Sequence, residues 1–304
     1  SLYHSPAIAS LSRKFPDRRG FAISLHGTGG SVGEVVGPVL VGGLISGTYL
    51  VAFTWQDVLH ISVGPALFFA ILVYLMMRNI PTAATDIESL GEYFNSLSTL
   101  LRRRAMISLV VVTALRSTGQ SAVMAFLPVY LNEELGYEFV VIGLFMSGAQ
   151  FIGILVQPLM GYLSDRFGRK VVLVPCTAAM GLLIGALKFT DQGGITVSLG
   201  AGRVEVDLLL ILTVLAMGAF LYSLHTIYIA SAMDVAEGQA QSTVVSLIYG
   251  ASFLGAFSPW VAGVIVDLTE TSNAFIYGGV MVIIGSIILA MTDLPRTVNQ
   301  ENAR

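Results

Sequence analysis

The chain has 304 residues, of which 55% are hydrophobic and only 12% are charged, against the roughly 25% of charged residues in an ordinary soluble domain. So large an apolar surplus, with a mean hydropathy of +0.78, excludes a soluble fold with a single buried core. The net charge of −3 gives no support to a nucleic-acid partner, and the single cysteine, Cys176, excludes an intramolecular disulfide.

Apolar runs long enough to cross a bilayer recur along the whole chain. A spanning helix needs about 20 predominantly apolar residues, and eight runs of this kind predict an all-α, polytopic bundle of membrane helices. They cover residues 21–46, 58–77, 106–131, 139–162, 171–189, 208–232, 242–267 and 274–293. Residues 1–12 are expected to be the end of a ninth helix rather than a signal peptide.

The basic residues alternate between the predicted loops. Thirteen Lys and Arg residues fall in one set of loops and two, Lys188 and Arg203, in the other. The positive-inside rule therefore places the first set and the carboxyl terminus in the cytoplasm, and a bacterial inner membrane is expected. The loop 234–241 is an exception, because it carries Asp234 and Glu237 and no basic residue. The larger set comprises Arg13, Lys14, Arg18, Arg19, Arg78, Arg102, Arg103, Arg104, Arg166, Arg169, Lys170, Arg296 and Arg304.

An internal repeat appears when residue n is compared with residue n+221. The matched pairs are His4 with His225, Gly29 with Gly250, Ser31 with Ser252, Pro38 with Pro259 and Gly42 with Gly263. Such repeats are typical of secondary transporters. We expect residues 1–77 to be the end of an amino-terminal bundle (the end of helix 4, then helices 5 and 6), residues 78–105 a cytoplasmic linker, 106–293 a complete six-helix bundle and 294–304 a cytoplasmic tail.

On this division the first three helices of a six-plus-six protein are absent from the sequence. The alternatives are a true nine-segment protein and a chance alignment.

The segment "GYLSDRFGRK" at residues 161–170 lies between two apolar runs. It resembles the cytoplasmic signature of the major facilitator superfamily, G-x-L-[SA]-D-[RK]-x-G-R-[RK]. The resemblance implies a two-bundle transporter whose signature loop braces the inner ends of helices across the bundle interface. The alternative is a plain positive-inside loop, which explains the basic residues but not Asp165 or the glycines.

The resemblance also implies roles for the residues of this loop. Asp165 is expected to pair with Arg169 or with a helix amino terminus, where the macrodipole favours an anion. Gly161 is expected to permit close packing, and Gly168 a tight turn. The basic residues that anchor the loop at anionic headgroups would be Arg166, Arg169 and Lys170.

A glycine-rich stretch, "GTGGSVGEVVGPVLVGGLI" at residues 27–45, resembles the fifth-helix motif of the superfamily's exporters, G-x-x-x-G-P-x-x-G-G, with one extra residue before the last pair of glycines. Gly29, Gly33 and Gly37 recur every fourth residue and predict a flat stripe that another helix can approach, and Pro38 predicts a kink. The alternative is ordinary small-residue packing. The implied interface motif is Gly29, Gly33, Gly37, Pro38 and Gly42.

The opening segment, "YHSPAIASLSRKFPDRRGFAISLHGTGGSVGEVVGP", looks like the fourth and fifth helices of efflux carriers of the fosmidomycin-resistance type. Its His-x-Pro and Arg-Arg-Gly elements carry that closer resemblance.

Ionisable residues inside predicted spans are candidates for function, because each costs about 2.5–3.5 kcal/mol at the bilayer centre on insertion scales. In the superfamily the first and fourth helices of each unit line the central cavity, so the resemblance places Arg116, His225, His4 and Gln120 on the substrate path. Arg116 is suited to bind an anionic group or a carboxylate that carries the coupling proton.

Glu34 and His26 are candidates for proton coupling, with Glu34 at the bundle interface. The alternative is that Glu34 and Arg116 neutralise each other or nearby carbonyls. Tyr222, Tyr228, Gln150 and Gln157 are expected to add cavity contacts or helix-packing hydrogen bonds.

These features predict a secondary active transporter with a small-molecule substrate, a proton or other coupling ion and membrane lipid as partners. Proton-coupled efflux is the first interpretation, and ion-coupled uptake of a small organic anion the second. A membrane-embedded enzyme or a non-transporting receptor is the alternative class. No enzymatic activity and no cofactor are expected, since the sequence contains no ATP-binding Gly-Lys-Ser/Thr run, no metal-spaced His/Cys cluster and no G-x-S-x-G elbow.

Overall fold

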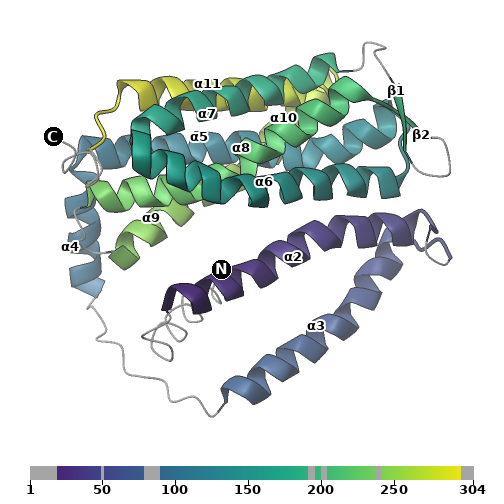
Figure 1. Ribbon diagram of the computed structural model, residues 1–304, viewed down its shortest axis with the longest axis horizontal. Helices are drawn as coiled ribbons and strands as arrows, with labels where there is room; N and C mark the ends of the chain where they lie inside the picture. Colours follow the sequence, from purple (N-terminus) through teal and green to yellow (C-terminus); the bar gives the residue numbers. More distant parts are fainter. Residues whose placement is uncertain are drawn as a thin grey trace.

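The computed structural model describes residues 19–48, 51–78, 90–190, 196–199, 204–236 and 241–295. These residues form long helices joined by short connections, with one small hairpin (Figure 1). The α-helices are α2 (Arg19–Ile45), α3 (Trp55–Met77), α4 (Leu90–Leu101), α5 (Arg104–Val129), α6 (Phe139–Phe167), α7 (Arg169–Ala186), α8 (Leu208–Val235), α9 (Gln241–Phe253), α10 (Ser258–Leu268) and α11 (Asn273–Met291). Shorter elements are the π-helical turn η2 (Tyr130–Glu134), the 3-10 turns η3 (Leu187–Phe189) and η4 (Leu254–Phe257), and the strands β1 (Thr196–Leu199) and β2 (Val204–Asp207).

Seven helical segments within the described ranges are long and apolar enough to span a membrane. The prediction of an all-α polytopic membrane bundle is therefore confirmed. The first predicted span, 21–46, corresponds to α2, of which the apolar part Gly30–Ile45 is shorter than the other spans.

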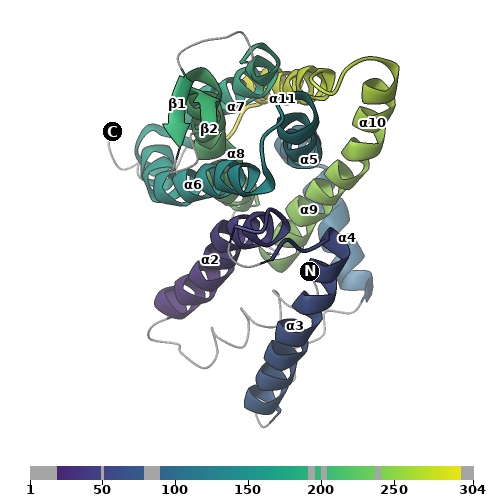
Figure 2. The same ribbon diagram turned by 90° about the vertical axis from the view of Figure 1, so that its right-hand side faces the viewer.

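The main bundle consists of α5, α6, α7, α8 and α11, which run side by side (Figures 1 and 2). Helices approach closely at glycines: a Cβ on Gly153 would lie 2.8 Å from the carbonyl oxygen of Gly218, and a Cβ on Gly181 would lie 3.0 Å from that of Gly279. In lipid, where there is little hydrophobic drive between helices, close backbone approach at small residues is what associates them. The small residues therefore determine where these helices meet.

Helix α2 packs along α6, and glycines set this contact too. A Cβ on Gly42 would collide with the carbonyl of Phe139, and a Cβ on Gly143 with that of Pro38. The predicted close approach on the other glycines of α2 is not seen in the described part: a Cβ at Gly33 or at Gly37 would meet no atom within 4 Å. The surroundings of Gly29 lie outside what the structure describes. The close backbone approach of α6 therefore occurs in the second half of α2, at Pro38 and Gly42.

The predicted span 242–267 is not one continuous α-helix. It is divided into α9 and α10 by the 3-10 turn η4, where Gly255 lies against Ser117 of α5 so closely that a Cβ would collide. Serine hydroxyls fasten both sides of this turn to α5: Ser117 Oγ donates to Ser252 O at 2.7 Å, and Ser258 Oγ donates to Thr118 O at 2.7 Å. Helix α5 is therefore hydrogen-bonded to both α9 and α10, on either side of the turn η4.

Helix α3 diverges from the bundle (Figure 1), and only 6% of its most apolar stretch is buried. Its start is set by a capping box, in which Asp57 N donates to Thr54 Oγ1 at 3.2 Å and Thr54 N donates to Asp57 Oδ2 at 3.0 Å. The predicted linker 78–105 contains α4, whose Leu100 is buried in the hydrophobic core. Arg103, at the end of that segment, donates from Nη1 to the carbonyl of Val235.

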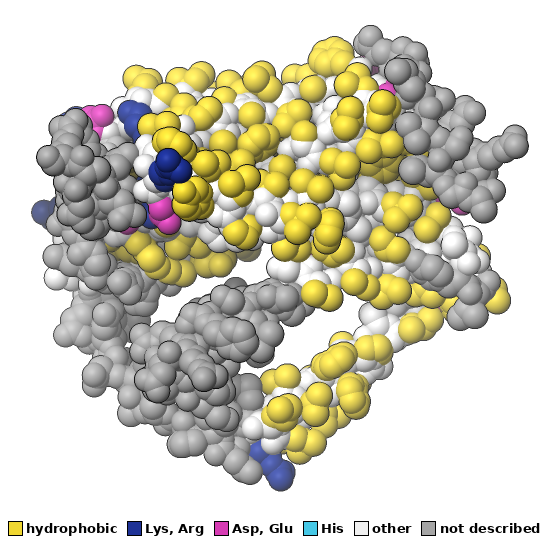
Figure 3. Space-filling model, in the orientation of Figure 1, with side chains coloured by type: hydrophobic (Ala, Val, Ile, Leu, Met, Phe, Trp, Pro, Cys, Tyr) yellow, Lys and Arg dark blue, Asp and Glu magenta, His cyan; other side chains and the backbone are white. Residues whose placement is uncertain are grey.

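The described basic residues of the α4–α5 and α6–α7 connections lie at one end of the bundle. The α6–α7 and α8–α9 connections, α4 and the end of α11 share that end, and the hairpin β1–β2 lies at the other (Figure 1). Figure 3 shows a largely hydrophobic surface with Lys and Arg side chains near the first end. The arrangement agrees with the alternation of charge in the sequence; which end faces the cytoplasm stays a prediction, as does the division into domains.

Candidate functional site

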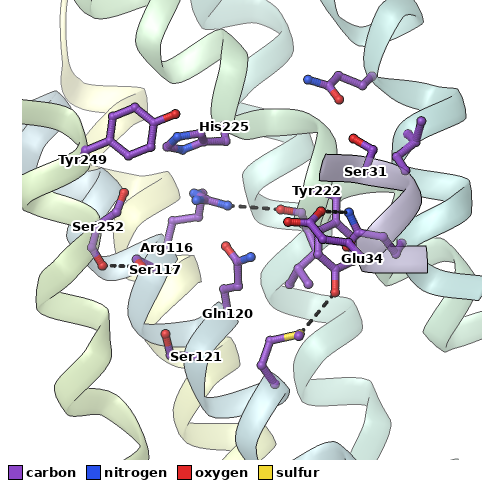
Figure 4. Close-up of a pocket in the computed structure, with 15 residues that line it drawn as sticks. Ser31, Glu34, Arg116, Ser117, Gln120, Ser121, Tyr222, His225, Tyr249 and Ser252 are labelled. Carbon is purple, nitrogen blue, oxygen red and sulfur yellow. Dashed lines mark hydrogen bonds between the residues drawn. The ribbon is translucent and has the colours of Figure 1, made fainter. Parts of the chain in front are cut away.

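A cavity of about 440 Å³ lies where α2 meets the main bundle. It draws side chains from α2, α5, α6, α8 and α9, so five helices converge on it. Figure 4 shows polar and charged side chains projecting into this space from all sides. The charged and amide residues that line it are Glu34, Arg116, Gln120, Gln150, Gln157 and His225.

Arg116 is only 3% exposed, near the middle of α5. Its Nη1 donates to the carbonyl of Leu221 at 3.2 Å, and its guanidinium carbon lies 5.8 Å from the ring centre of Tyr228. Tyr228 is itself held by a 2.6 Å hydrogen bond between its hydroxyl and that of Thr177. Nε of Arg116 has no hydrogen-bond partner among the described residues. A buried donor without a partner costs about 1–3 kcal/mol, and more when it is charged, so this guanidinium is incompletely satisfied.

His225 lies on α8 beside Arg116, as Figure 4 shows. Its ring packs edge-on against Tyr249 of α9, with ring centres 5.1 Å apart and an interplanar angle of 67°. Its Nδ1 is buried, and no described residue bonds to it. Two nitrogen groups on the same wall of the cavity therefore lack partners.

Glu34 lies on the opposite wall, on α2, where Nε2 of Gln150 donates to its Oε2 at 2.6 Å. Arg116 and Glu34 form no ion pair with each other in the part of the chain that the structure describes. The alternative interpretation was that Glu34 and Arg116 are neutralised by each other or by nearby carbonyl groups. Only one such contact is present, the hydrogen bond of Arg116 to the carbonyl of Leu221. Glu34 is instead bonded to a neutral amide.

Four of the predicted site residues line the same cavity: Arg116, Gln120, Glu34 and His225. His4 lies outside the described residues, as does the side chain of His26. The roles assigned to all six stay predictions.

The sequence interpretation missed Ser31, Tyr249 and Ser252, which also line the cavity. A signal was present for two of them, because the offset of 221 residues pairs Ser31 with Ser252. The two members of this pair approach the cavity from α2 and α9, as expected if the two helices are repeat mates.

The signature loop forms a compact ionic network. Arg169 bonds to Asp165 one turn before it, and its Nε donates to Asp234 Oδ2 of α8 at 2.9 Å. Its Nη1 also donates to Ser164 Oγ at 2.9 Å. The predicted pairing of Asp165 with Arg169 is present, and Asp234, the acidic exception among the basic loops, is its second partner. Gly168 has φ 101°, a conformation that favours glycine, so the tight turn is present too.

One expectation for this loop needs correction, and a second stays untested. A Cβ on Gly161 would meet no atom within 4 Å in the described part, so this glycine makes no close helix contact there. The contacts of Arg169 join α6, α7 and α8 within the predicted carboxyl-terminal bundle, and the bracing of helices across two bundles stays a prediction. Of the other basic residues, Arg166 donates to the hydroxyl of Tyr162 at 3.0 Å, and Lys170 lies 4.0 Å from a carboxylate oxygen of Asp293.

Comparison with known proteins identifies relatives over the whole chain. A family model described as Major Facilitator Superfamily matches residues 1–153 and, overlapping with these, residues 109–304. The multidrug efflux protein YfmO of Bacillus subtilis (strain 168) is 24% identical over 297 residues, which cover 96% of this chain and 67% of that protein.

Other relatives match over shorter stretches. The bacillibactin exporter of the same organism is 32% identical over 101 residues, 33% of this chain and 25% of that protein. The multidrug resistance protein MdtG of Serratia proteamaculans (strain 568) is 27% identical over 192 residues, 61% of this chain and 44% of that protein. The aligned part of this chain thus spans about two thirds of the first relative and less than half of the other two.

Proposed function

The chain belongs to the major facilitator superfamily, and from that premise we propose that it is a secondary active transporter that exports a small organic molecule in exchange for protons. It is a multi-pass membrane protein by family and by its spanning helices. We place it in a bacterial inner membrane with its carboxyl terminus in the cytoplasm, on the distribution of Lys and Arg. The names of the relatives, two multidrug proteins and an exporter, support export over uptake.

The observation that carries the proposal is the cavity between α2 and the main bundle. Its lining is polar and charged although the helices that form it are apolar outside. Polar groups at this depth are costly and mark substrate or ion paths. Transport then proceeds by rocking of two repeat-related units about this site.

Glu34 is the proposed carrier of the coupling proton. It is the only acidic side chain that lines the cavity among the described residues, and its partner there is a neutral amide. A carboxylate held by an ion pair resists protonation, whereas one bonded to an amide can gain a proton without leaving an unpaired charge. Protonation would remove the charge of Glu34 and add an O–H donor at its carboxyl group, and so change the charge-assisted contact with Gln150 between α2 and α6.

The Arg169 network is proposed to hold the inner ends of α6, α7 and α8 together. Arg169 is the centre of three contacts, to Asp165, Asp234 and Ser164. A bundle fastened in this way at its end moves as one body. In this proposal the signature loop supports rocking by keeping one unit rigid.

The test is transport by the purified protein in proteoliposomes, with benzoate as an anionic probe and ethidium as a cationic probe. We expect probe movement driven by an imposed pH gradient and opposite to the proton flow. Glu34→Gln should reduce gradient-driven flux to the level of empty liposomes. Glu138→Gln, the same change at an exposed acid at the start of α6, is the matched control and should retain flux.

Each other outcome has a definite meaning. Movement of probe in the same direction as protons would replace export by uptake, the second interpretation. Absence of gradient-driven movement for both probes would contradict the proposed export by this chain. Full coupling in the Glu34→Gln variant would remove Glu34 from the mechanism.

A further inference from the structure

We propose that Arg116 and His225 form an oxyanion subsite, so that the transported molecule carries a carboxylate, phosphonate or similar anionic group. The inference rests on the proposed transport function and names the chemical class of its substrate. It starts from two buried nitrogen atoms that the fold leaves without a partner, Arg116 Nε and His225 Nδ1. Both residues line the same cavity.

The guanidinium of Arg116 is oriented from two sides. The carbonyl of Leu221 fixes Nη1, and the ring of Tyr228 lies against the guanidinium group. Tyr228 is anchored in turn by Thr177. These contacts set the position of the guanidinium at the cavity wall. Once the side chain turns toward the cavity, its remaining N–H groups can form the fork that matches the two oxygens of a carboxylate or phosphonate.

Among the residues that the structure describes, no carboxylate is bonded to the guanidinium of Arg116. The acidic residue across the cavity, Glu34, is bonded to Gln150 rather than to Arg116. His225, Gln120 and Ser117 line the cavity together with Arg116 (Figure 4), and none of the three is acidic. Ser117 already donates to Ser252 O. A bound anion would supply the counter-charge that Arg116 lacks among the described residues.

His225 extends the same subsite. Its ring position is set by the edge-on contact with Tyr249, and Figure 4 shows the imidazole beside the guanidinium on one wall. An oxyanion between the two side chains would accept hydrogen bonds from both. Nε and Nδ1 are shielded from solvent in this conformation, so rotation of the two side chains toward the cavity accompanies binding.

The test measures binding without transport. A cysteine is introduced by Ser121→Cys at the cavity wall, in a Cys176→Ala background that removes the natural thiol. Its alkylation by N-ethylmaleimide is timed with benzoate, phenylphosphonate or benzamide present. Benzoate and phenylphosphonate should slow the alkylation, and benzamide, which has the shape of benzoate without its charge, should not.

Variants locate the anion. Arg116→Lys keeps the charge but loses the fork, and should raise the benzoate concentration needed for half-protection by about tenfold or more. His225→Phe keeps the ring against Tyr249 but removes its nitrogens, and should raise it by a smaller factor. Arg78→Lys and His60→Phe make the same changes on α3, outside the cavity, and should leave protection unchanged.

The source of the anion is distinguished by lipid. Equal protection in nanodiscs of neutral and of anionic phospholipid assigns the subsite to soluble anions. Loss of protection by benzoate only in the anionic nanodiscs assigns it to a lipid headgroup, still an oxyanion but not the substrate, and overturns the substrate class.

Other results overturn the subsite directly. If benzamide protects the cysteine as well as benzoate does, the subsite is rejected. This comparison needs no substitution at Arg116, so it remains valid even if the Arg116→Lys variant fails to fold. Unchanged protection in a folded Arg116→Lys protein would also reject the subsite. Probe flux driven by a pH gradient, without protection that is selective for anions, supports the proposed function and rejects the subsite. Anion-selective protection without flux supports the subsite and rejects the proposed function.

Discussion

The closest contact between α6 and α8 makes a sharp prediction at Gly218. A Cβ built on Gly218 would lie 2.5 Å from Ala149 Cα and 2.7 Å from Ala149 C. Favourable contacts between carbon atoms lie at about 3.5–4.0 Å, so Gly218→Ala requires the two helices to separate by about 1 Å. The obstacle is backbone, which cannot turn aside as a side chain can.

The expected cost is the difference between two effects. Overpacking of this kind costs about 1–3 kcal/mol, and separation of the helices also loosens the contact of Gly153 with α8. Against this, Ala is better than Gly in a helix by about 1 kcal/mol. Gly218→Ala should therefore lower the free energy of unfolding by about 1–2 kcal/mol.

Gly161→Ala on α6 is the matched control. A Cβ there would meet nothing within 4 Å among the described residues, so only the gain in helix propensity remains and the variant should be as stable as the parent or more so. The assay is thermal unfolding in detergent, followed by the fraction that stays monodisperse. Equal apparent melting temperatures for the Gly218→Ala and Gly161→Ala variants would refute the steric argument.

Two further predictions concern charged contacts at the ends of the bundle. Asp234→Asn should lower stability by about 1 kcal/mol, because Arg169 loses a 2.9 Å ionic contact that joins α7 to α8; a denaturant titration measures it, and an unchanged midpoint would contradict it. Hydrogen bonds from Ser272 and then Lys188 hold the pKa of Glu270 below the usual 4.5. A group whose pKa is lowered on folding stabilises the folded state at a pH above its unfolded-state pKa, and this effect is lost as the pH falls through its folded-state pKa. The melting temperature should therefore drop below pH 4.5, and it should drop less in the Glu270→Gln variant. The same dependence of melting temperature on pH in both proteins would exclude the contact.

The sequence predicted the membrane helices well because their apolar runs are long. The interruption of the span 242–267 was missed although Pro259 signals it, since proline cannot donate to the carbonyl of Gly255 and is favoured at the first turn of a new helix. The contacts of Gly255 and Ser258 with α5, which a single sequence does not reveal, fix the 3-10 turn there. The hairpin β1–β2 was missed although the sequence offers a signal: two short runs with β-branched residues, 196–199 and 204–207, flank four residues that include two glycines. Helix ends and breaks depend on neighbours that a single sequence does not reveal.

The site was predicted in part for a similar reason. Depth alone marked Arg116, Glu34 and His225, since charge inside an apolar run is rare. Which helix lies opposite each of them depends on packing, so the contact of Glu34 with Gln150 was not foreseen. The glycine stripe of α2 illustrates the limit: the pattern indicated close approach, but the approach occurs at Gly42.

Several inter-helix attachments in this protein end on a main-chain carbonyl rather than on another side chain. The donors are Arg103, Arg116, Ser117 and Ser258, and each bonds to a backbone oxygen of a distant helix residue. Every amino acid supplies such an oxygen, so substitution of Leu221 does not remove the acceptor of Arg116. Mutational scans should therefore register only the donor of each pair, and correlated substitution between the two positions should be weak even where the attachment matters.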